Sequence, residues 1–417
     1  MSDPVCCPGS RADDRRRRRL IAVFAATNTV AYGALIHAFT ALLVPLSEAL
    51  NATRTEVAVA ATISTLVGAV AAVPVGALLD RYGGRALMST GSAVGVGAVL
   101  LWSQAQNLGQ LYLAFGLVGL ALAMSTYEAA FAVLVVAVDS RRRDSAIVAV
   151  TMICGLATSF FTFLTGWLDT LIGWRATLLV LATVLAAVAV PLHLWAVPDR
   201  AAHLGRATAA GGEPVGSALR SPRFWLLVVA FVAQSGATAA FMLMMVAYFR
   251  DVGHAPTTAA AMPIAVGVLQ VVSRMALAPL ARRFGMTRVT AFSFAVQGLG
   301  LIAMPLAGAS VPWTLLCVAG FGLGLGVSVV ARPSIVADTF GVARFAGILA
   351  LMTVPVAASR AGTPLAAAWL ADWRFLVVIG AATLLAAAAL VPLCGPDRVE
   401  ETILVDAHGR SRPESDA

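Results

Sequence analysis

One short stretch decides the fold of this chain: GALLDRYGGR, at residues 76–85. It ends one long apolar run and leads into another, so the chain reverses within a few residues, and Gly83 suits such a turn because glycine adopts backbone angles that other residues avoid. A related stretch, APLARRFGMTR, lies at residues 278–288, with Gly285 in the place of Gly83. A second pair of landmarks, GWR at 173–175 and DWR at 372–374, has nearly the same offset. Together they predict two related halves.

The composition predicts a membrane protein. Of the 417 residues, 59% are hydrophobic and 12% are charged, whereas soluble domains average about 25% charged residues. The apolar residues form twelve runs of roughly 20–28 residues, each long enough to cross about 30 Å of hydrocarbon as a helix, and β-barrel strands would be shorter. We therefore expect an all-α membrane protein, with 12 transmembrane helices in two pseudo-symmetric six-helix bundles. The runs lie at 20–46, 55–79, 86–104, 110–138, 145–170, 175–197, 223–249, 256–281, 289–308, 312–336, 345–371 and 374–394.

These runs define the expected domain organisation. A basic tail at 1–19 precedes the N-terminal bundle at 20–197, a polar linker at 198–222 joins it to the C-terminal bundle at 223–394, and a second tail covers 395–417. The chain has no lysine, and 23 of its 29 arginines, Arg332 counted among them, fall on one side of the membrane, against four on the other. The positive-inside rule predicts cytoplasmic tails and linker in a multi-pass protein of the plasma membrane.

The remaining features exclude other classes. The net charge is +8, but the arginines lie in short loops between apolar runs, which argues against a nucleic-acid partner. The cluster at 15–19 indicates topology, with binding of anionic lipid as the alternative. The sequence contains no zinc-type Cys/His spacing and no Walker-type loop. We therefore expect no enzyme activity, no metal and no cofactor.

Two six-helix halves and the 76–85 stretch together resemble the major facilitator superfamily of secondary transporters. The signature of that family between helices 2 and 3 is matched by Gly76, Asp80, Arg81, Gly83 and Arg85. The resemblance implies that this cluster closes the inner gate in the outward-open state, that helices 1, 4, 7 and 10 line a central cavity, and that the protein is a monomer. The second copy has Arg282 in the place of the acid, so we expect the two loops to differ in function.

A branch of that superfamily gives a closer resemblance. Tyr32-Gly33 and the stretch LNATRTEV at 50–57 are similar to the first two helices of monocarboxylate-transporter-like proteins. In helix 8 that branch carries Asp-x-x-x-Arg, and this chain has Gln270 and Arg274 there. The resemblance implies a carboxylate substrate, whereas the loss of the acid puts proton coupling through helix 8 in doubt.

Ionisable residues inside apolar runs are candidates for the site, because such groups are costly in the membrane unless they face a cavity or a partner. Arg274 and Arg360 could clamp a carboxylate, since a guanidinium offers two parallel hydrogen bonds. Glu128 and His37 are candidate proton carriers. Static interhelical salt bridges are the alternative for Glu128 and the arginines. Asn28 and Tyr32 share a helix face and, with Gln234 and Gln270, could form a polar wall.

The sequence therefore predicts a proton-coupled secondary transporter that moves a small organic anion, with a monocarboxylate as the expected substrate, by rocking its two halves around a midplane site. The alternative is a proton-driven efflux pump for drugs or a toxic metalloid. The absence of proline from helix 5, between Cys154 and Gly166, lowers the weight of that alternative. A receptor without transport activity is a third class, but the expected helices leave no room for a signalling domain.

Overall fold

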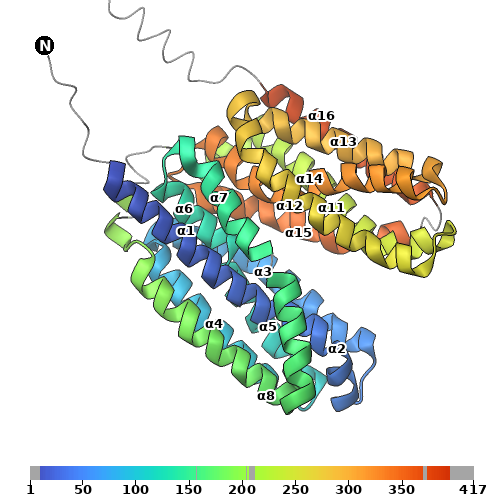
Figure 1. Cartoon of the computed structure of the whole chain (residues 1–417). Helices are drawn as coiled ribbons and strands as arrows, with labels where there is room; N and C mark the ends of the chain where they lie inside the picture. Colours follow the sequence, from blue (N-terminus) through green and yellow to red (C-terminus); the bar gives the residue numbers. More distant parts are fainter. Residues whose placement is uncertain (1–9, 156, 203, 206–211, 370–372, 395–417) are drawn as a thin grey trace, which may run out of the picture.

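The computed structural model describes residues 10–155, 157–202, 204–205, 212–369 and 373–394. The secondary structure within these ranges is helical, apart from one isolated bridge between Gly212 and Gly341. Figure 1 shows two helical bundles side by side, one formed by the N-terminal half and one by the C-terminal half. The expected fold class, an all-helical membrane protein with two six-helix bundles, is confirmed.

The N-terminal bundle contains six crossings. The first is built from α1, the π-helical η1 and α2; the second and third are α3 and α4; the fourth is α5 with α6; and the last two are formed by α7 and α8. The bounds are α1 Ser10–Tyr32, η1 Gly33–His37, α2 Ala38–Ala49, α3 Arg54–Tyr82, α4 Gly84–Ser103, α5 Leu108–Ser125, α6 Tyr127–Ala137, α7 Ser140–Gly155 and α8 Ala157–Ala196.

The C-terminal bundle also contains six crossings, preceded by the short α10, Val215–Arg220. They are α11 Pro222–Asp251, α12 Pro256–Phe284, α13 Met286–Ala307, α14 Val311–Phe340, α15 Phe345–Trp369 and α16 Arg374–Leu390. A short 3-10 helix, Val391–Leu393, follows. Several helices extend beyond the apolar runs; α14, for example, continues to Phe340 instead of ending near residue 336.

Eleven helices of the described chain are long and apolar enough to cross a membrane. One of them, Arg142–Ala196, is 55 residues long, or about 80 Å at the rise of an α-helix, more than twice the hydrocarbon thickness. Two helices meet within it at Gly173, whose φ of 77° and ψ of 160° are not helical. This stretch therefore supplies two crossings, and the total is twelve.

The repeat seen in the sequence reappears in the turns. Gly83 joins α3 to α4 with a φ of 79°, and Gly285 joins α12 to α13 with a φ of 84°. Both angles lie in the left-handed region that residues with a Cβ atom rarely adopt. The helix after each turn is also anchored in the same way: Arg85 donates to the carbonyl of Val197 at 2.8 Å, and Arg288 donates to that of Cys394 at 3.1 Å.

Glycine allows close helix packing in both bundles. Gly68 of α3 lies against Gly119 of α5. In α14, alternate glycines contact two different neighbours, because Gly320 and Gly324 face α13 while Gly322 and Gly326 face α12. Small residues at such contacts let helix backbones approach closely.

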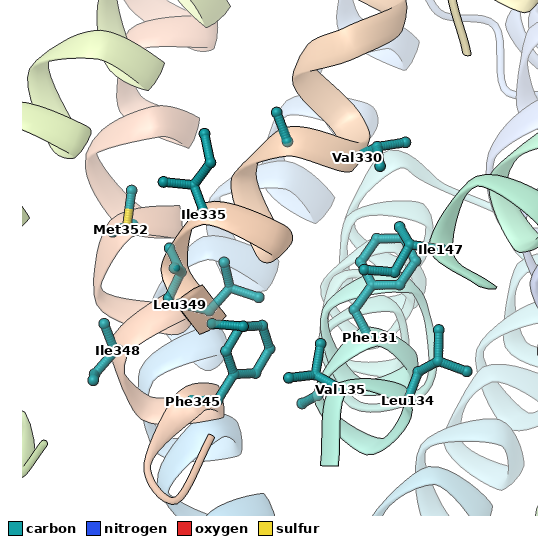
Figure 2. Packing of buried hydrophobic residues seen from close by; sticks show 14 of the residues in the cluster. Phe131, Leu134, Val135, Ile147, Val330, Ile335, Phe345, Ile348, Leu349 and Met352 are labelled. Carbon is teal, nitrogen blue, oxygen red and sulfur yellow. The ribbon is translucent and has the colours of Figure 1, made fainter. Parts of the chain in front are cut away.

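The buried apolar side chains show where the halves meet. One cluster draws on both bundles, and Figure 2 shows part of it, with Phe131, Val135 and Ile147 from the N-terminal half facing Phe345 and Val330 from the C-terminal half. The other two clusters each belong to one half. We call the end that holds the shared cluster the arginine-rich end, because Arg85, Arg143, Arg288 and Arg344 lie at the helix ends there. In Figure 1 the bundles diverge toward the other end, which carries α2.

Candidate functional site

A cavity of about 700 Å³ lies between the two bundles. Its size falls within the range of about 300–1,000 Å³ that is typical of small-molecule sites. Most of its wall comes from α3, between Ala61 and Leu79, and from α15, between Ala346 and Pro364. The N-terminal half adds residues of α1, η1, α5 and α6, and α11 adds Ala239 and Leu243. The second and eleventh crossings, α3 and α15, thus line more of this cavity than the superfamily resemblance implies. The tenth crossing, α14, supplies no lining residue in the described chain.

Small side chains make up most of the cavity wall. Alanine, glycine, serine and threonine predominate along both α3 and α15. Two of the lining residues are charged, Glu128 from α6 and Arg360 from α15. The wall is therefore a smooth and mainly apolar surface with one acidic and one basic group.

Glu128 reaches the cavity because the fourth crossing is broken. The helix stops at Ser125, Thr126 has a φ of −108° and a ψ of −150°, and a new helix starts at Tyr127. The hydroxyls of Ser125 and Thr126 donate back to the carbonyls of Ala121 and Leu122 at 2.7 and 2.6 Å. Such bonds compete with the regular helix. The break leaves Glu128 in the first turn of α6, where the helix dipole favours a negative charge.

The partner of Glu128 is Arg332, which the sequence analysis assigned to an inner loop. That assignment is wrong, because Arg332 lies within α14 and its Nη2 atom is 3.1 Å from Glu128 Oε1. The side chains are 21% and 32% exposed, so the pair is neither fully buried nor fully in water. It joins the N-terminal half to the C-terminal half. An arginine inside the apolar run at 312–336 was the signal that could have identified it.

Arg360 is the cationic group of the wall. It is exposed and lies on α15 among Ala357, Ala361 and Pro364. No described carboxylate lies within 4.0 Å of its guanidinium, whereas Arg332 is neutralised by Glu128. Within the described part of the chain, the cavity therefore presents an uncompensated positive charge at Arg360, which favours an anionic guest.

Tyr32 lies on the same cavity, at the point where α1 passes into the π-helical turn η1. Gly33 follows it, and the Phe161 ring occupies the space that a Cβ atom at Gly33 would need. The rings of Tyr32 and Tyr127 are 4.9 Å apart, and Tyr127 stacks on Phe131 at 5.0 Å. Single π-helical turns often occur at functional sites. His37 ends this turn and does not belong to the cavity wall that the structure describes.

Arg274 and Gln270 lie at a different contact between the halves. Arg274 is buried, and its guanidinium donates to Gln270 Oε1 at 2.7 Å, to the Gly326 carbonyl at 3.3 Å and to the Thr151 carbonyl of α7 at 3.3 Å. All three acceptors are neutral. The bond to Thr151 crosses from one half to the other. Neither Arg274 nor Gln270 lines the cavity within the described chain.

Asn28 and Gln234 are both buried away from the cavity. Asn28 donates to the carbonyl of Phe24 at 2.8 Å, within its own helix. Gln234 donates to Thr238 at 3.0 Å and lies 3.4 Å from Gln297, which packs α11 against α13. Of the expected polar wall, the cavity lining in the described chain contains only Tyr32.

The signature stretch closes the arginine-rich end. Asp80 accepts hydrogen bonds from the backbone N–H of Gly347 at 2.9 Å and of Ala346 at 3.3 Å. These groups lie in the first turn of α15, where unsatisfied N–H groups and the helix dipole attract a carboxylate. Gly76 allows the approach, because a Cβ atom there would lie 2.6 Å from the Ala346 carbonyl oxygen. Arg81 is exposed, with its guanidinium 5.3 Å from the Tyr82 ring.

A second ion pair supports this closure. Arg143 of α7 lies 2.9 Å from Asp338 of α14. Together with Glu128–Arg332 and the contact of Asp80, it links the halves through charged side chains, in addition to the bond from Arg274 to Thr151. Phe131, Val135 and Phe345 seal the same end with apolar contacts. The apolar clusters of the other end stay within their own halves. The structure is therefore closed at the arginine-rich end.

Two bundles that are closed at one end, with a cavity between them, define a secondary-transporter architecture. The Major Facilitator Superfamily profile matches residues 20–328, and the chain belongs to that family. Members of this family are transporters rather than enzymes, and the protein is accordingly a multi-pass membrane transporter. No curated protein matches the chain.

Solved structures show the same fold at low sequence identity. The human organic anion transporter MFSD10 (TETRAN) is 15% identical, with a TM-score of 0.67, and 90% of this chain aligns with 99% of that one. The fucose:proton symporter FucP of E. coli is 14% identical, with a TM-score of 0.65 and coverage of 96% and 98%. The proton:xylose symporter XylE is 12% identical, with a TM-score of 0.68 and coverage of 93% and 97%.

Proposed function

We propose that the protein is a proton-coupled transporter of a small organic anion, with Arg360 as the ligand of the anionic group. The observation that carries this proposal is the uncompensated guanidinium of Arg360 on the wall of a 700 Å³ cavity. A guanidinium binds a carboxylate through two parallel hydrogen bonds. Because the sequence resembles the monocarboxylate-transporter-like branch, a monocarboxylate is the proposed substrate.

The rest of the cavity wall favours a mainly apolar anion as the substrate rather than a sugar. A sugar needs many hydrogen-bonding partners, and buried polar groups left unpaired weaken binding. The carboxamides of Asn28, Gln234, Gln270 and Gln297 all lie outside the described lining. Alanine and threonine side chains would instead contact a short alkyl or aryl group. MFSD10 is named an organic anion transporter, which agrees with this substrate class.

The closed end supports an orientation in which the cavity opens to the outside of the membrane. The positive-inside rule predicts that the arginine-rich end faces the cytoplasm. On that assignment the structure is an outward-facing state, and transport requires the contacts of Glu128, Asp80 and Arg143 with the other half to break while the other end closes. Both bundles then rock around the site.

Glu128 is the proposed proton carrier. Its carboxylate is held by Arg332 in the closed state, and protonation would remove the charge that holds the pair together. A bound substrate carboxylate near Arg360 would place a second negative charge on the cavity wall that Glu128 lines. Loading of substrate and proton would thus together release one link between the halves.

Uptake in proteoliposomes tests the proposal. The purified protein is reconstituted, a pH gradient is imposed, and uptake of a panel of labelled short-chain and aromatic monocarboxylates is compared with that of fucose and xylose. We expect saturable uptake of a carboxylate and a decrease of more than about tenfold in the uptake rate of Arg360→Gln. Arg360→Lys should retain part of the uptake, because lysine keeps the charge but cannot donate two parallel hydrogen bonds from one planar group. Arg250→Gln, an exposed arginine outside the cavity, is the matched control.

Proton coupling is tested in the same vesicles. Glu128→Gln mimics the protonated side chain, so we expect carboxylate exchange to persist while the response to a pH gradient disappears. A pH response that survives this substitution contradicts the role of Glu128. Folded protein that takes up no carboxylate at all contradicts the anion proposal and favours the efflux alternative.

A further inference from the structure

A second cavity, of about 430 Å³, lies at the arginine-rich end of the N-terminal bundle. It is formed where the beginning of α1, the beginning of α4 and the end of α8 meet. Figure 1 shows the beginning of α1 at the end of its bundle remote from α2. The lining residues are Arg15, Arg16, Arg19, Leu20, Arg85, Trp195, Ala196, Pro198, Asp199 and Ala202.

The charge of this cavity is strongly one-sided. Four arginines line it, against one carboxylate, that of Asp199. Asp199 accepts a hydrogen bond from the N–H of Ala202 at 3.0 Å. In the described part of the chain no carboxylate lies within 4.0 Å of Arg15, Arg19 or Arg85; the acidic partner of this region, Asp14, pairs instead with Arg17 and Arg142. Among the described residues, the cavity therefore concentrates positive charge that ion pairs leave largely unneutralised.

Two of the arginines are held in place by contacts that leave part of each guanidinium available. Arg19 lies over the Trp195 ring, 3.4 Å from its centroid, and donates one bond to the Trp195 carbonyl at 2.7 Å. Arg85 donates to Val197 through Nε. A guanidinium has five N–H donors, and stacking on an aromatic face leaves its edge open to an anion. Both side chains are thus pre-positioned for an oxyanion.

The position along the membrane normal indicates the source of that oxyanion. Leu20, fully buried, begins the apolar run of α1 immediately after the arginine cluster. Trp195 is 62% exposed at the end of α8, and tryptophan is enriched at the level of lipid headgroups. The cavity therefore lies where the hydrocarbon region gives way to the polar region, and clusters of arginine at this level attract anionic lipids.

We propose that this cavity binds the phosphate of an anionic phospholipid headgroup, with Arg15, Arg19 and Arg85 as ligands and Trp195 as the platform that orients Arg19. The site ties the beginning of the first crossing to the end of the sixth through the headgroup. It is independent of the transported solute and of Arg360. A free inorganic phosphate has the same chemistry, and the experiment separates the two sources.

Lipid binding to the full-length protein tests the site. Native mass spectrometry of the detergent-purified chain is used to titrate phosphatidylglycerol, phosphatidylcholine and inorganic phosphate. We expect preferential retention of phosphatidylglycerol over phosphatidylcholine, and a loss of about tenfold or more in its affinity for the double variant Arg15→Gln/Arg19→Gln. The control double variant Arg220→Gln/Arg223→Gln removes two exposed arginines from the same end, outside the cavity, and should keep the wild-type affinity.

Further measurements exclude a folding artefact and identify the source of the phosphate. The apparent Tm of Arg15→Gln/Arg19→Gln without added lipid should decrease only slightly, since the variant loses one bond to a backbone carbonyl and the contact with Trp195. Arg19→Lys should bind with intermediate affinity. Inorganic phosphate that fails to displace the lipid at millimolar concentration supports the headgroup. Equal retention of both lipids by the wild type, equal losses in both double variants, or displacement of the lipid by inorganic phosphate would overturn the proposal.

Discussion

The two copies of the signature loop keep the same turn but make different contacts. Gly83 and Gly285 both adopt a positive φ, and Arg85 and Arg288 both donate to the carbonyl that ends the last crossing of their own half. Asp80, in contrast, binds the beginning of α15 in the other half. Its counterpart in the second loop is Arg282, which cannot accept hydrogen bonds from N–H groups.

This difference separates what builds the fold from what controls it. The glycine and the second arginine serve the internal geometry of a six-helix bundle, so both copies need them. The acid serves the contact between the bundles, and the first copy alone carries it. The closed state is therefore asymmetric, although the scaffold is nearly symmetric.

The largest difference between the loops is expected from the acid itself. Asp80→Asn weakens two charge-assisted hydrogen bonds to the beginning of α15, and bonds to charged groups contribute about 1.5–3 kcal/mol each. We expect the transport rate in proteoliposomes to fall more than about tenfold, because the closed state of the arginine-rich end loses population. Arg282→Asn is the matched change in the second loop, and its transport rate should fall by less than about twofold. Similar losses in both variants would show that the asymmetry is not functional.

A somewhat smaller effect is expected at Gly76. The Cβ atom in Gly76→Ala would lie 2.6 Å from the Ala346 carbonyl oxygen, and overpacking of this kind costs about 1–3 kcal/mol. The second loop has Ala278 at the equivalent position, so Ala278→Gly should be tolerated. Accessibility of a cysteine introduced at the arginine-rich end to a thiol reagent measures the change, and it should rise in Gly76→Ala alone. Unchanged accessibility contradicts the proposed close contact.

The two turns themselves should respond alike. Gly83→Ala and Gly285→Ala each force a residue with a Cβ atom into the left-handed region, at a cost of about 1–2 kcal/mol. We expect both substitutions to lower the apparent Tm in detergent by similar amounts. A loss confined to one of them would mean that the repeat is not structurally equivalent at the turn.

The smallest effect is expected from the arginines that anchor each turn. Arg85→Gln and Arg288→Gln each remove hydrogen bonds to a backbone carbonyl near the protein surface, which contribute about 0.5–1.5 kcal/mol. Both variants should show a small decrease in thermal stability with transport largely retained. A large loss of transport in Arg288→Gln alone would assign the second loop a role in gating.

The sequence predicted the elements that depend on local patterns. The twelve apolar runs, the repeat around Gly83 and Gly285, and the membership of the superfamily all follow from features that lie close together in the chain. The cavity wall also contains Glu128, Arg360 and Tyr32, and their position inside apolar runs marks them as candidates in the sequence. Their chemical roles stay predictions.

The features that the sequence did not predict depend on distant partners. Arg332 pairs with Glu128 across 204 positions, and Arg143 pairs with Asp338 across 195. An arginine inside an apolar run marks Arg332 as a candidate for such a pair, but no pattern within one helix indicates which distant residue is its partner. Gln270 illustrates the same limit, because the sequence cannot show that its carbonyl oxygen accepts from Arg274 at the contact between α7 and α12 rather than lining the cavity.

Chemical protection of Arg360 tests the central claim most directly. Phenylglyoxal modifies accessible guanidinium groups, and peptide mass spectrometry measures the modification at each arginine of the purified transporter. The account predicts that a transported monocarboxylate lowers the modification of Arg360 in a saturable way and leaves that of Arg250, an exposed arginine outside the cavity, unchanged. Modification of Arg360 that is the same with and without every carboxylate would contradict it.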